Sequence, residues 1–353
     1  MTQRSSLSGP IGKGIALAVA AAMSFGAATP FLQYFGRAVA PFTTAALLYA
    51  GAALASFVGQ GGRSETRLRR SDAPRLLGVA ALGAFLAPVL LAWGLRRTSG
   101  TSASLMLNFE AGFTVMLGRI FFREHLGARV GVAAALIAVG GALLILDRGT
   151  AADAHAIGLL AVLGASLAWS LDNTLGKPLA ERDVSAVVRA KCALGAALSA
   201  VLAIARSETF PPYSAAAGIL ACGAIGYGAS LRMYLLAQRR LGAARTASVF
   251  AVAPFVGAAI AWGMGQQVGI AFAAAAALML LGVWLHATER HAHAHHHARL
   301  EHDHAHTHDD DHHNHVHDPM PAGPHAHPHR HEPASHEHPH APDAHHLHEH
   351  EHS

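Results

Sequence analysis

Ten apolar segments, each about twenty residues long, constrain the fold of this chain more than any other feature. A helix needs about 20 predominantly apolar residues to cross roughly 30 Å of hydrocarbon. The pattern therefore predicts an all-α integral membrane protein with ten transmembrane helices. The expected spans are 14–35, 39–59, 75–95, 100–122, 130–147, 156–176, 184–204, 214–237, 242–264 and 267–288.

The segments between these spans are mostly shorter than 15 residues. Such connections are too short for domains outside the membrane, so a substrate site is expected among the helices and a membrane-anchored enzyme is not. Cys192 and Cys222 both fall inside apolar runs, where they indicate no disulfide framework and no zinc site. The sequence contains no phosphate-binding glycine loop, which favours coupling to an ion or substrate gradient over nucleotide hydrolysis.

Basic residues in the connecting segments predict the orientation. With the N-terminus inside, the inner segments carry fourteen Lys and Arg and the outer segments carry five. Short cytoplasmic loops are enriched in these residues, so both termini are expected in the cytoplasm. Six more basic residues lie towards the predicted inner ends of the spans and are expected to reach the interface as anchors: Arg75, Arg119, Arg189, Lys191, Arg232 and Arg245.

The net charge of the chain is +4, but it is unevenly divided. The last 63 residues are acidic, whereas the part up to residue 290 is strongly basic. Because the basic residues stand in short gaps between apolar runs, they are read as topology signals and not as a nucleic-acid surface. Scarce Lys beside abundant Ala, Gly and Arg is typical of a GC-rich bacterial genome, which favours the cytoplasmic (inner) membrane.

The two halves of the chain show weak internal similarity. Met23-Ser24-Phe25-Gly26 aligns with Leu167-Ala168-Trp169-Ser170 at an offset of 144 residues, and 123–127 aligns with 265–269 at an offset of 142. Five spans per half is an odd number, so the second copy must begin on the opposite face of the membrane. Inverted repeats of this kind are the architecture of alternating-access transporters.

Two short motifs in the first half carry a resemblance to a known family. They are Asn108-Phe109-Glu110-Ala111-Gly112-Phe113 and, with its glutamate 14 residues after Glu110, Phe122-Arg123-Glu124-His125-Leu126-Gly127. The chain resembles the EamA-type family of drug/metabolite transporters, whose five-helix halves carry a Leu-Glu-Pro motif in the fourth helix and a Gly-Glu-Arg-Leu-type motif after it. Ala111 departs from the proline of that motif, and the second half has Pro254 but Ala253 in place of glutamate.

The expected domains are a first five-helix repeat over 1–148, a second over 149–288 and a disordered, histidine-rich cytoplasmic tail over 289–353. Within the spans, Glu110 is the deepest acidic residue, and an ionisable group in mid-membrane is a functional candidate by default. It is expected to bind a cationic or polar substrate group or to take up a proton. The alternative is a glutamate that fixes its span to a neighbour.

Other candidates for the substrate path are polar, aromatic or helix-breaking. Asp172 and Asn173 form a polar pair near the inner end of their span, where capping or contact with Lys177 is the alternative to a gate. Pro88 and Pro254 are expected to kink or break their helices. The complete set of path candidates is Glu110, Asn108, Asp172, Asn173, Trp93, Trp169, Tyr227 and Pro254.

The tail holds 25 of the 28 histidines in the segment 291–353 and has no apolar periodicity. Repeated imidazoles without thiolates suit zinc, nickel, cobalt or copper(II), although the spacing selects none of these. The alternative is a solvated tail whose metal binding is incidental. The expected ligands are His291, His293, His295, His296, His297, His302, His304, His306, His308, His312, His313, His315, His317, His325, His327, His329, His348 and His350.

The function predicted from these features is secondary transport of small organic metabolites by alternating access, in the direction of export, with a tail that buffers or senses divalent metal. Two alternatives stay open: a divalent-metal exporter whose tail collects the ion, and a membrane-tethered metal store or sensor. No cofactor is required for any of these. The expected partners are the lipid bilayer, a small-molecule substrate and divalent metal ions, but not nucleic acid, and a homodimer is left open.

Overall fold

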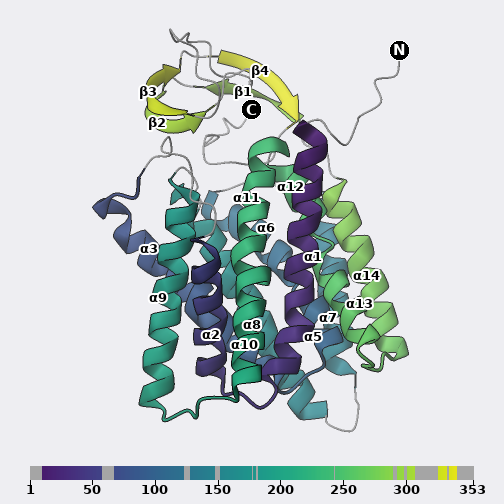
Figure 1. The fold of residues 1–353 in the computed structure, drawn as a ribbon. Helices are drawn as coiled ribbons and strands as arrows, with labels where there is room; N and C mark the ends of the chain where they lie inside the picture. The colour runs from purple at the N-terminus through teal and green to yellow at the C-terminus, as the bar shows by residue number, and fades with distance from the viewer. Residues whose placement is uncertain are drawn as a thin grey trace.

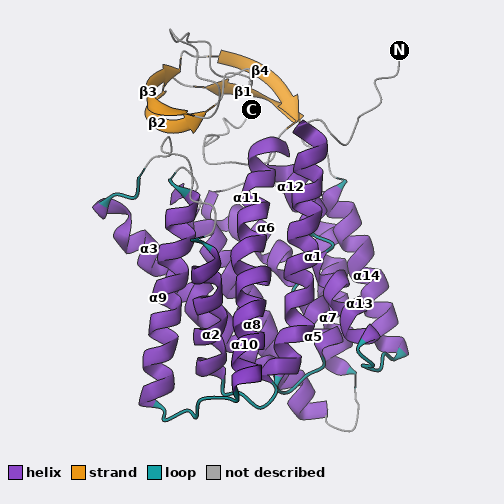
Figure 2. Cartoon of the chain, in the orientation of Figure 1, coloured by secondary structure: helices purple, strands orange, loops and turns teal. Residues whose placement is uncertain are grey.

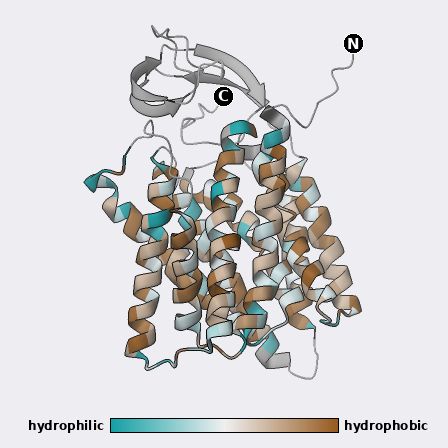
Figure 3. Ribbon diagram, viewed as in Figure 1, coloured by the Kyte–Doolittle hydropathy of each residue, from teal (hydrophilic) through white to brown (hydrophobic). Residues whose placement is uncertain are grey.

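The computed structural model is a bundle of helices with roughly parallel long axes (Figure 1). It describes residues 10–57, 67–122, 128–147, 152–176, 178–179, 182–241, 243–288, 292–297, 300–306, 325–331 and 334–339. We call the end where α1 begins and α14 finishes the upper end of the bundle, and the opposite end the lower end, as they stand in Figure 1. Apolar residues run along the length of the helices (Figure 3).

The first half of the chain supplies five helical stretches. Three of them are simple or nearly so: α1 (Pro10–Gly36), α2 (Pro41–Ala55) and α7 (Ala128–Leu146). The third stretch joins η1 (Arg70–Asp72), α3 (Ala73–Val79), a π-helical segment η2 (Ala80–Leu86) and α4 (Ala87–Leu95). The fourth consists of α5 (Gly100–Met106) and α6 (Phe109–Phe122).

The second half repeats this series. Its simple helices are α8 (Ala152–Gly176), α9 (Val184–Ala205) and α14 (Ile270–Ala287). Its third stretch joins α10 (Tyr213–Cys222), a π-helical segment η4 (Gly223–Ala229) and α11 (Ser230–Leu241). Its fourth is divided into α12 (Ala243–Phe250) and α13 (Ala253–Gly263).

Irregular backbone occurs at matching places in the two halves. The π-helical segments begin at Ala80 and Gly223, which are 143 residues apart (223 minus 80), and the fourth stretches are interrupted at 107–108 and 251–252. Pro88 follows the first π-helical segment, whereas the second contains three glycines and no proline. A break at Pro254 was expected, but the break at 107–108 forms without a proline.

Eight of the described helical stretches are long and apolar enough to cross a membrane. The two other predicted spans correspond to α2, which has 15 residues, and to the α5–α6 pair, which the turn at 107–108 divides. The all-helical membrane architecture is therefore confirmed, and the number of ten crossings is not.

The tail differs from the expectation of disorder in four segments. Strand β1 (Ala292–His297) pairs antiparallel with β4 (Ala334–Pro339), and β2 (Leu300–His306) pairs antiparallel with β3 (His325–His331). These strands are drawn in orange in Figure 2. Alternation of histidine with other residues has the two-residue period of a strand, so an extended pairing is compatible with the same pattern that predicted disorder. Disorder of the tail is not confirmed.

Helix α2 packs closely against α9, α10 and η4. Two glycines bring the backbones together: a methyl group at Gly51 would overlap the carbonyl of Leu220, and one at Gly223 would overlap the carbonyl of Leu48. Small residues allow this close approach between membrane helices, where packing replaces the hydrophobic effect.

A carboxylate stabilises the beginning of α2 and another stabilises the beginning of α9, at opposite ends of the bundle. At the lower end, Glu208 accepts hydrogen bonds from the backbone N–H of Thr43 (2.7 Å) and from its hydroxyl (2.8 Å) at the start of α2. At the upper end, Asp72 forms an ion pair with Arg182 (3.0 Å), which directly precedes the N-cap of α9. The two acids stand in corresponding loops of the two halves, which supports the inverted repeat.

Replacing Gly223 by alanine should destabilise the protein, because the added methyl group forces η4 away from α2. Overpacking of this kind typically costs about 1–3 kcal/mol. The matched control is Gly131→Ala in α7, where the added methyl group would meet nothing within 4 Å. The unfolding temperature of the purified protein in detergent checks the expectation, and equal temperatures for the two variants would contradict it.

Candidate functional site

Two aromatic residues that the internal repeat aligns with one another meet at the centre of the bundle. The rings of Phe25 in α1 and Trp169 in α8 are 6.4 Å apart and nearly perpendicular. The adjoining positions also correspond. Gly26 packs against the carbonyl of Ala253 at the α12–α13 break, and the Ser170 hydroxyl donates to the carbonyl of Glu110 just after the other break (2.8 Å).

Four further rings extend this pair into an aromatic cluster. Tyr227 in η4 lies 5.5 Å from Phe25, 6.1 Å from Trp169 and 5.7 Å from Tyr49 in α2. Phe250, at the end of α12, lies 5.4 Å from Phe25 and 5.0 Å from Tyr234 of α11. We call these six rings the aromatic cluster: Phe25, Tyr49, Trp169, Tyr227, Tyr234 and Phe250.

The π-helical segment η2 contributes a backbone acceptor to this cluster. The carbonyl of Gly83 accepts hydrogen bonds from the Tyr49 hydroxyl (2.5 Å) and from the indole N–H of Trp169 (2.9 Å). A π-helical turn leaves carbonyls without their usual α-helical donors, and such turns are frequent at functional sites. The two donors therefore satisfy the irregular backbone and fix the orientation of both rings.

The turn at 107–108 is stabilised by polar side chains. The Asn108 amide donates to the carbonyl of Leu105 (2.9 Å), and the Ser166 hydroxyl donates to the carbonyl of Met106 (3.5 Å). With Ser170 bonded to the carbonyl of Glu110, these groups satisfy backbone acceptors that a continuous helix would pair internally. Asn108 is thus a buried structural residue of the break, beside Met279 of α14.

Glu110 lies in the first turn of α6, directly after this break. Its carboxylate accepts a hydrogen bond from the amide of Asn173 (2.9 Å) in α8, and Asn173 is exposed. Glu110 is thereby placed one turn of α8 from Trp169 of the aromatic cluster, because Asn173 follows Trp169 by four residues. Its half-buried side chain therefore belongs to the interior of the bundle and not to a lipid-facing surface.

A partly buried ion pair adjoins this carboxylate. Asp172 in α8 pairs with Lys191 in α9, and Asp172 directly precedes Asn173, the partner of Glu110. Asp172 rests on the α-carbon of Gly83, where an added methyl group would overlap its carboxylate. Contact with Lys177 was the alternative considered for Asp172, and Lys177 lies outside the described residues. Lys191, which was predicted to be an interface anchor, is a half-buried partner of Asp172.

The lower end of the bundle is tied together by two glutamines. Gln33 of α1 donates to the carbonyls of Leu95 (3.1 Å) and Thr98 (2.6 Å) and accepts from the amide of Gln266 (2.6 Å), whose own oxygen accepts from the N–H of Thr101 (3.1 Å). We call Gln33, Thr98, Thr101 and Gln266 the lower latch. It joins α1, the end of α4, the start of α5 and the loop before α14.

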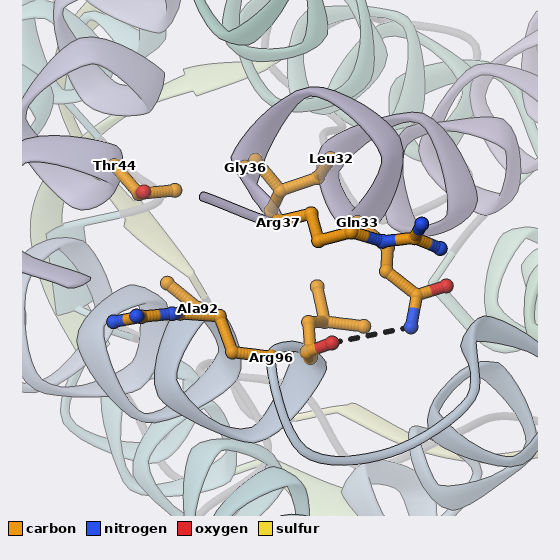
Figure 4. Close-up of a pocket in the computed structure, with 8 residues that line it drawn as sticks. Leu32, Gln33, Gly36, Arg37, Thr44, Ala92 and Arg96 are labelled. Atoms are coloured by element: carbon orange, nitrogen blue, oxygen red, sulfur yellow. Dashed lines mark hydrogen bonds between the residues drawn. The ribbon is translucent and has the colours of Figure 1, made fainter. Parts of the chain in front are cut away.

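Beside the lower latch is a narrow crevice between α1, α2 and α4 that has no room for a water molecule. Figure 4 shows Gln33 hydrogen-bonded in its wall, with Arg37 and Arg96 among the lining side chains. The lower halves of the two divided stretches, α5 and α13, also pack against one another. Among the described residues, the main contacts of the upper halves are with separate helices: α6 packs on α7 and α8, and α12 packs on α1, α11 and α14.

The structure brings five of the predicted path residues to one region: Glu110, Asn173, Asp172, Trp169 and Tyr227. Pro254, in the first turn of α13, stands next to the break that adjoins Gly26. Trp93 lies elsewhere, near the lower end of α4, where the guanidinium of Arg97 stacks 3.5 Å above its ring. The position of Trp93 along its span could not predict which face of the helix its side chain would lie on.

Several residues of the site were not found by sequence reasoning. Tyr49, Tyr234 and Phe25 looked like ordinary apolar positions, because ring contacts between distant helices leave no local pattern. Ser166 and Ser170 carried a usable signal, since two hydroxyls four residues apart on an otherwise apolar helix fall on one face.

Metal binding was predicted only for the tail. Ten of the expected ligands lie in β1–β4, where the register places His302 opposite His329 and His304 opposite His327. The other eight lie outside the described residues: His291, His308, His312, His313, His315, His317, His348 and His350. In the part of the chain that the structure describes, no group of three or more His, Cys, Asp or Glu residues is arranged to hold a metal ion.

Comparison with known proteins gives three similarities. The model of the EamA-like transporter family matches twice, at residues 12–146 and 156–288. An uncharacterized transporter of Methanothermobacter thermautotrophicus (strain Delta H) is 30% identical over 210 residues, which are 58% of this chain and 61% of that protein. A crystal structure that is 20% identical matches with a TM-score of 0.58 over 79% of this chain and 96% of its own, which establishes similarity of fold alone.

Removing one partner of the Asp172–Lys191 pair should destabilise the protein, because a buried charge is left alone. Breaking such a pair typically costs roughly 3–5 kcal/mol. We expect large losses of unfolding temperature for Asp172→Asn and Lys191→Met, and a smaller loss for the double variant than the sum of the two. Asp147→Asn, which removes an exposed charge, is the control. Strictly additive losses would show that the two side chains do not interact.

Proposed function

The chain belongs to the EamA-like transporter family, and on that premise we propose that it is a secondary transporter that exports small organic solutes by alternating access. The observation that carries the proposal is the Glu110–Asn173 pair. It is a polar pair, in part exposed, between two apolar helices, next to a broken span and the aromatic cluster. A charged group at this depth is costly unless it faces water or a ligand.

The lower latch supports a closed pathway on that side of the protein. Four elements are joined there by hydrogen bonds of the two glutamines, and the adjoining crevice has no room for water. At the upper end the halves α6 and α12 pack mainly on separate helices. We therefore infer an inward-facing conformation, in which solute enters from the upper end and is released after the latch opens.

The upper end is assigned to the cytoplasm in this proposal. The excess of Lys and Arg in the segments at that end supports the assignment, as does the usual distribution of basic residues in bacterial membrane proteins. Ten crossings follow if α2 and the α5–α6 pair also traverse the bilayer. Both termini are then on the cytoplasmic side of the inner membrane.

For the histidine-rich tail we propose a separate role, in which it binds Zn²⁺, Ni²⁺, Co²⁺ or Cu²⁺ and so buffers or senses metal near the transporter. Neutral imidazoles suit these ions, and the tail offers 25 of them. The donor set of the interior site is different in kind, because it consists of carboxylates, amides and aromatic rings. This difference favours transport of an organic solute over export of the metal itself.

One comparison separates these roles. Three proteins are measured for efflux of organic solutes in a metabolite screen and for accumulated metal in cells: the full chain, a chain lacking 289–353, and Glu110→Gln. We expect Glu110→Gln to abolish solute efflux at unchanged abundance, because it removes the interior charge, and the tail deletion to change only metal accumulation. Asp147→Asn is the control for loss of a carboxylate.

Each other outcome rejects a specific part of the proposal. Solute efflux that survives in Glu110→Gln would remove Glu110 from the transport site. Metal efflux that depends on both Glu110 and the tail would identify the protein as a metal exporter. Metal tolerance that needs the tail without any solute efflux would favour a membrane-tethered metal store.

A further inference from the structure

Charge is unbalanced in the interior site. Lys191 is paired with Asp172, so its positive charge is already neutralised. Glu110 accepts its hydrogen bond from the neutral amide of Asn173, and it has no ion-pair partner in the part of the chain that the structure describes. Arg119, the other charged residue of α6, is nine residues further on, roughly 13 Å along the helix. With the Glu110 carboxylate ionised, the three ionisable groups together carry one negative charge.

The aromatic cluster lies near this charge, because Asn173, the partner of Glu110, follows Trp169 by one turn of α8. Phe25 and Phe250 link Tyr227 to Tyr234 through ring contacts of 5.0–5.5 Å. The face of an aromatic ring is negative and attracts a cation placed over it. A carboxylate and the faces of these rings therefore attract the same kind of ligand.

An unpaired hydroxyl in the aromatic cluster also indicates a ligand there. The side chain of Tyr227 is only 8% exposed, and its hydroxyl has no hydrogen-bond partner among the described residues. Buried hydroxyls are normally paired, and an exception requires an explanation. A phenol oxygen can accept a hydrogen bond from an ammonium N–H or lie against the methyl groups of a quaternary ammonium.

We propose that the substrates of this site are small organic monocations, amines or quaternary ammonium compounds that carry an apolar group. The cation is held between the Glu110 carboxylate and the faces of the aromatic cluster, with Tyr227 oriented towards its nitrogen. This assignment rests on the proposed transport function and names its substrate class. A divalent metal ion fits less well, since it requires several oxygen or imidazole ligands and the site offers one unpaired carboxylate.

Equilibrium binding to the purified full-length protein in detergent tests the assignment. The probe is radiolabelled benzyltrimethylammonium, and the competitors are unlabelled benzyltrimethylammonium, neutral 2-phenylethanol and anionic phenylacetate. We expect saturable binding of the cation with a dissociation constant below about 10 mM. The neutral and anionic compounds of similar size should displace the probe at least about tenfold less well than the cation.

Variants identify the residues that hold the probe. Glu110→Gln should weaken binding by at least about tenfold, because the counter-ion is lost, and Glu110→Asp should keep part of the affinity. Phe25→Leu should weaken binding by about threefold, since one ring face is removed. The matched controls are Asp147→Asn and Phe210→Leu, which alter exposed side chains outside the site and should bind as the unaltered protein does. Unfolding temperatures verify that each variant is folded.

Three results would overturn the assignment: no saturable binding of the cation, equal displacement by phenylacetate or 2-phenylethanol, or unchanged affinity in Glu110→Gln. The transport proposal is tested separately by the metabolite screen. If Glu110→Gln abolishes efflux of neutral or anionic solutes while the cation does not bind, the transporter stands and the substrate class is wrong. If no solute efflux depends on Glu110, the transport site itself is wrong.

Discussion

Inside hydrocarbon an unpaired backbone N–H or C=O is so costly that irregular backbone survives only where protein groups or water satisfy it. In this chain the departures from α-helical geometry gather around one interior region. The carbonyl of Gly83 in η2 is satisfied by Tyr49 and Trp169, and the turn at 107–108 is satisfied by Asn108, Ser166 and Ser170. The side chains that donate hydrogen bonds to these backbone carbonyls are therefore the same groups that make the centre of the bundle polar.

The two halves reach equivalent backbones through different residues. Pro88 accompanies one π-helical segment and a glycine-rich sequence forms the other, while Pro254 follows one break and Glu110 follows its counterpart. Duplication thus accounts for the shared architecture, including the carboxylates at the beginnings of α2 and α9. Only the first half supplies an acid at this place, Glu110, because Ala253 provides no matching charge in the second half. This single acid gives the site its chemical character.

The sequence was most informative where physical constraints act locally. Span length and the inverted repeat predicted the helical bundle, and Glu110, Asn173 and Trp169 were found because polar or aromatic residues stand out in apolar spans. The partner of Asp172 could not be predicted, since Lys191 lies on another helix and contact between helices leaves no trace in spacing. The contact of Trp93 with Arg97, away from the aromatic cluster, could not be predicted for the same reason, and the short α2 shows why the number of crossings is harder to predict than the fold.

In the proposed alternating-access cycle the polar centre lies next to a closed lower end, so the lower latch must open in every cycle. The most direct test introduces cysteines at Gln33 and Gln266 and bridges them with a short bis-thiosulfonate reagent, which forms a reducible disulfide with each cysteine, while the buried Cys192 and Cys222 are left in place. The account predicts that bridging stops solute efflux and that reduction restores it, while each single cysteine variant continues to transport. Undiminished efflux through the bridged protein would contradict the account.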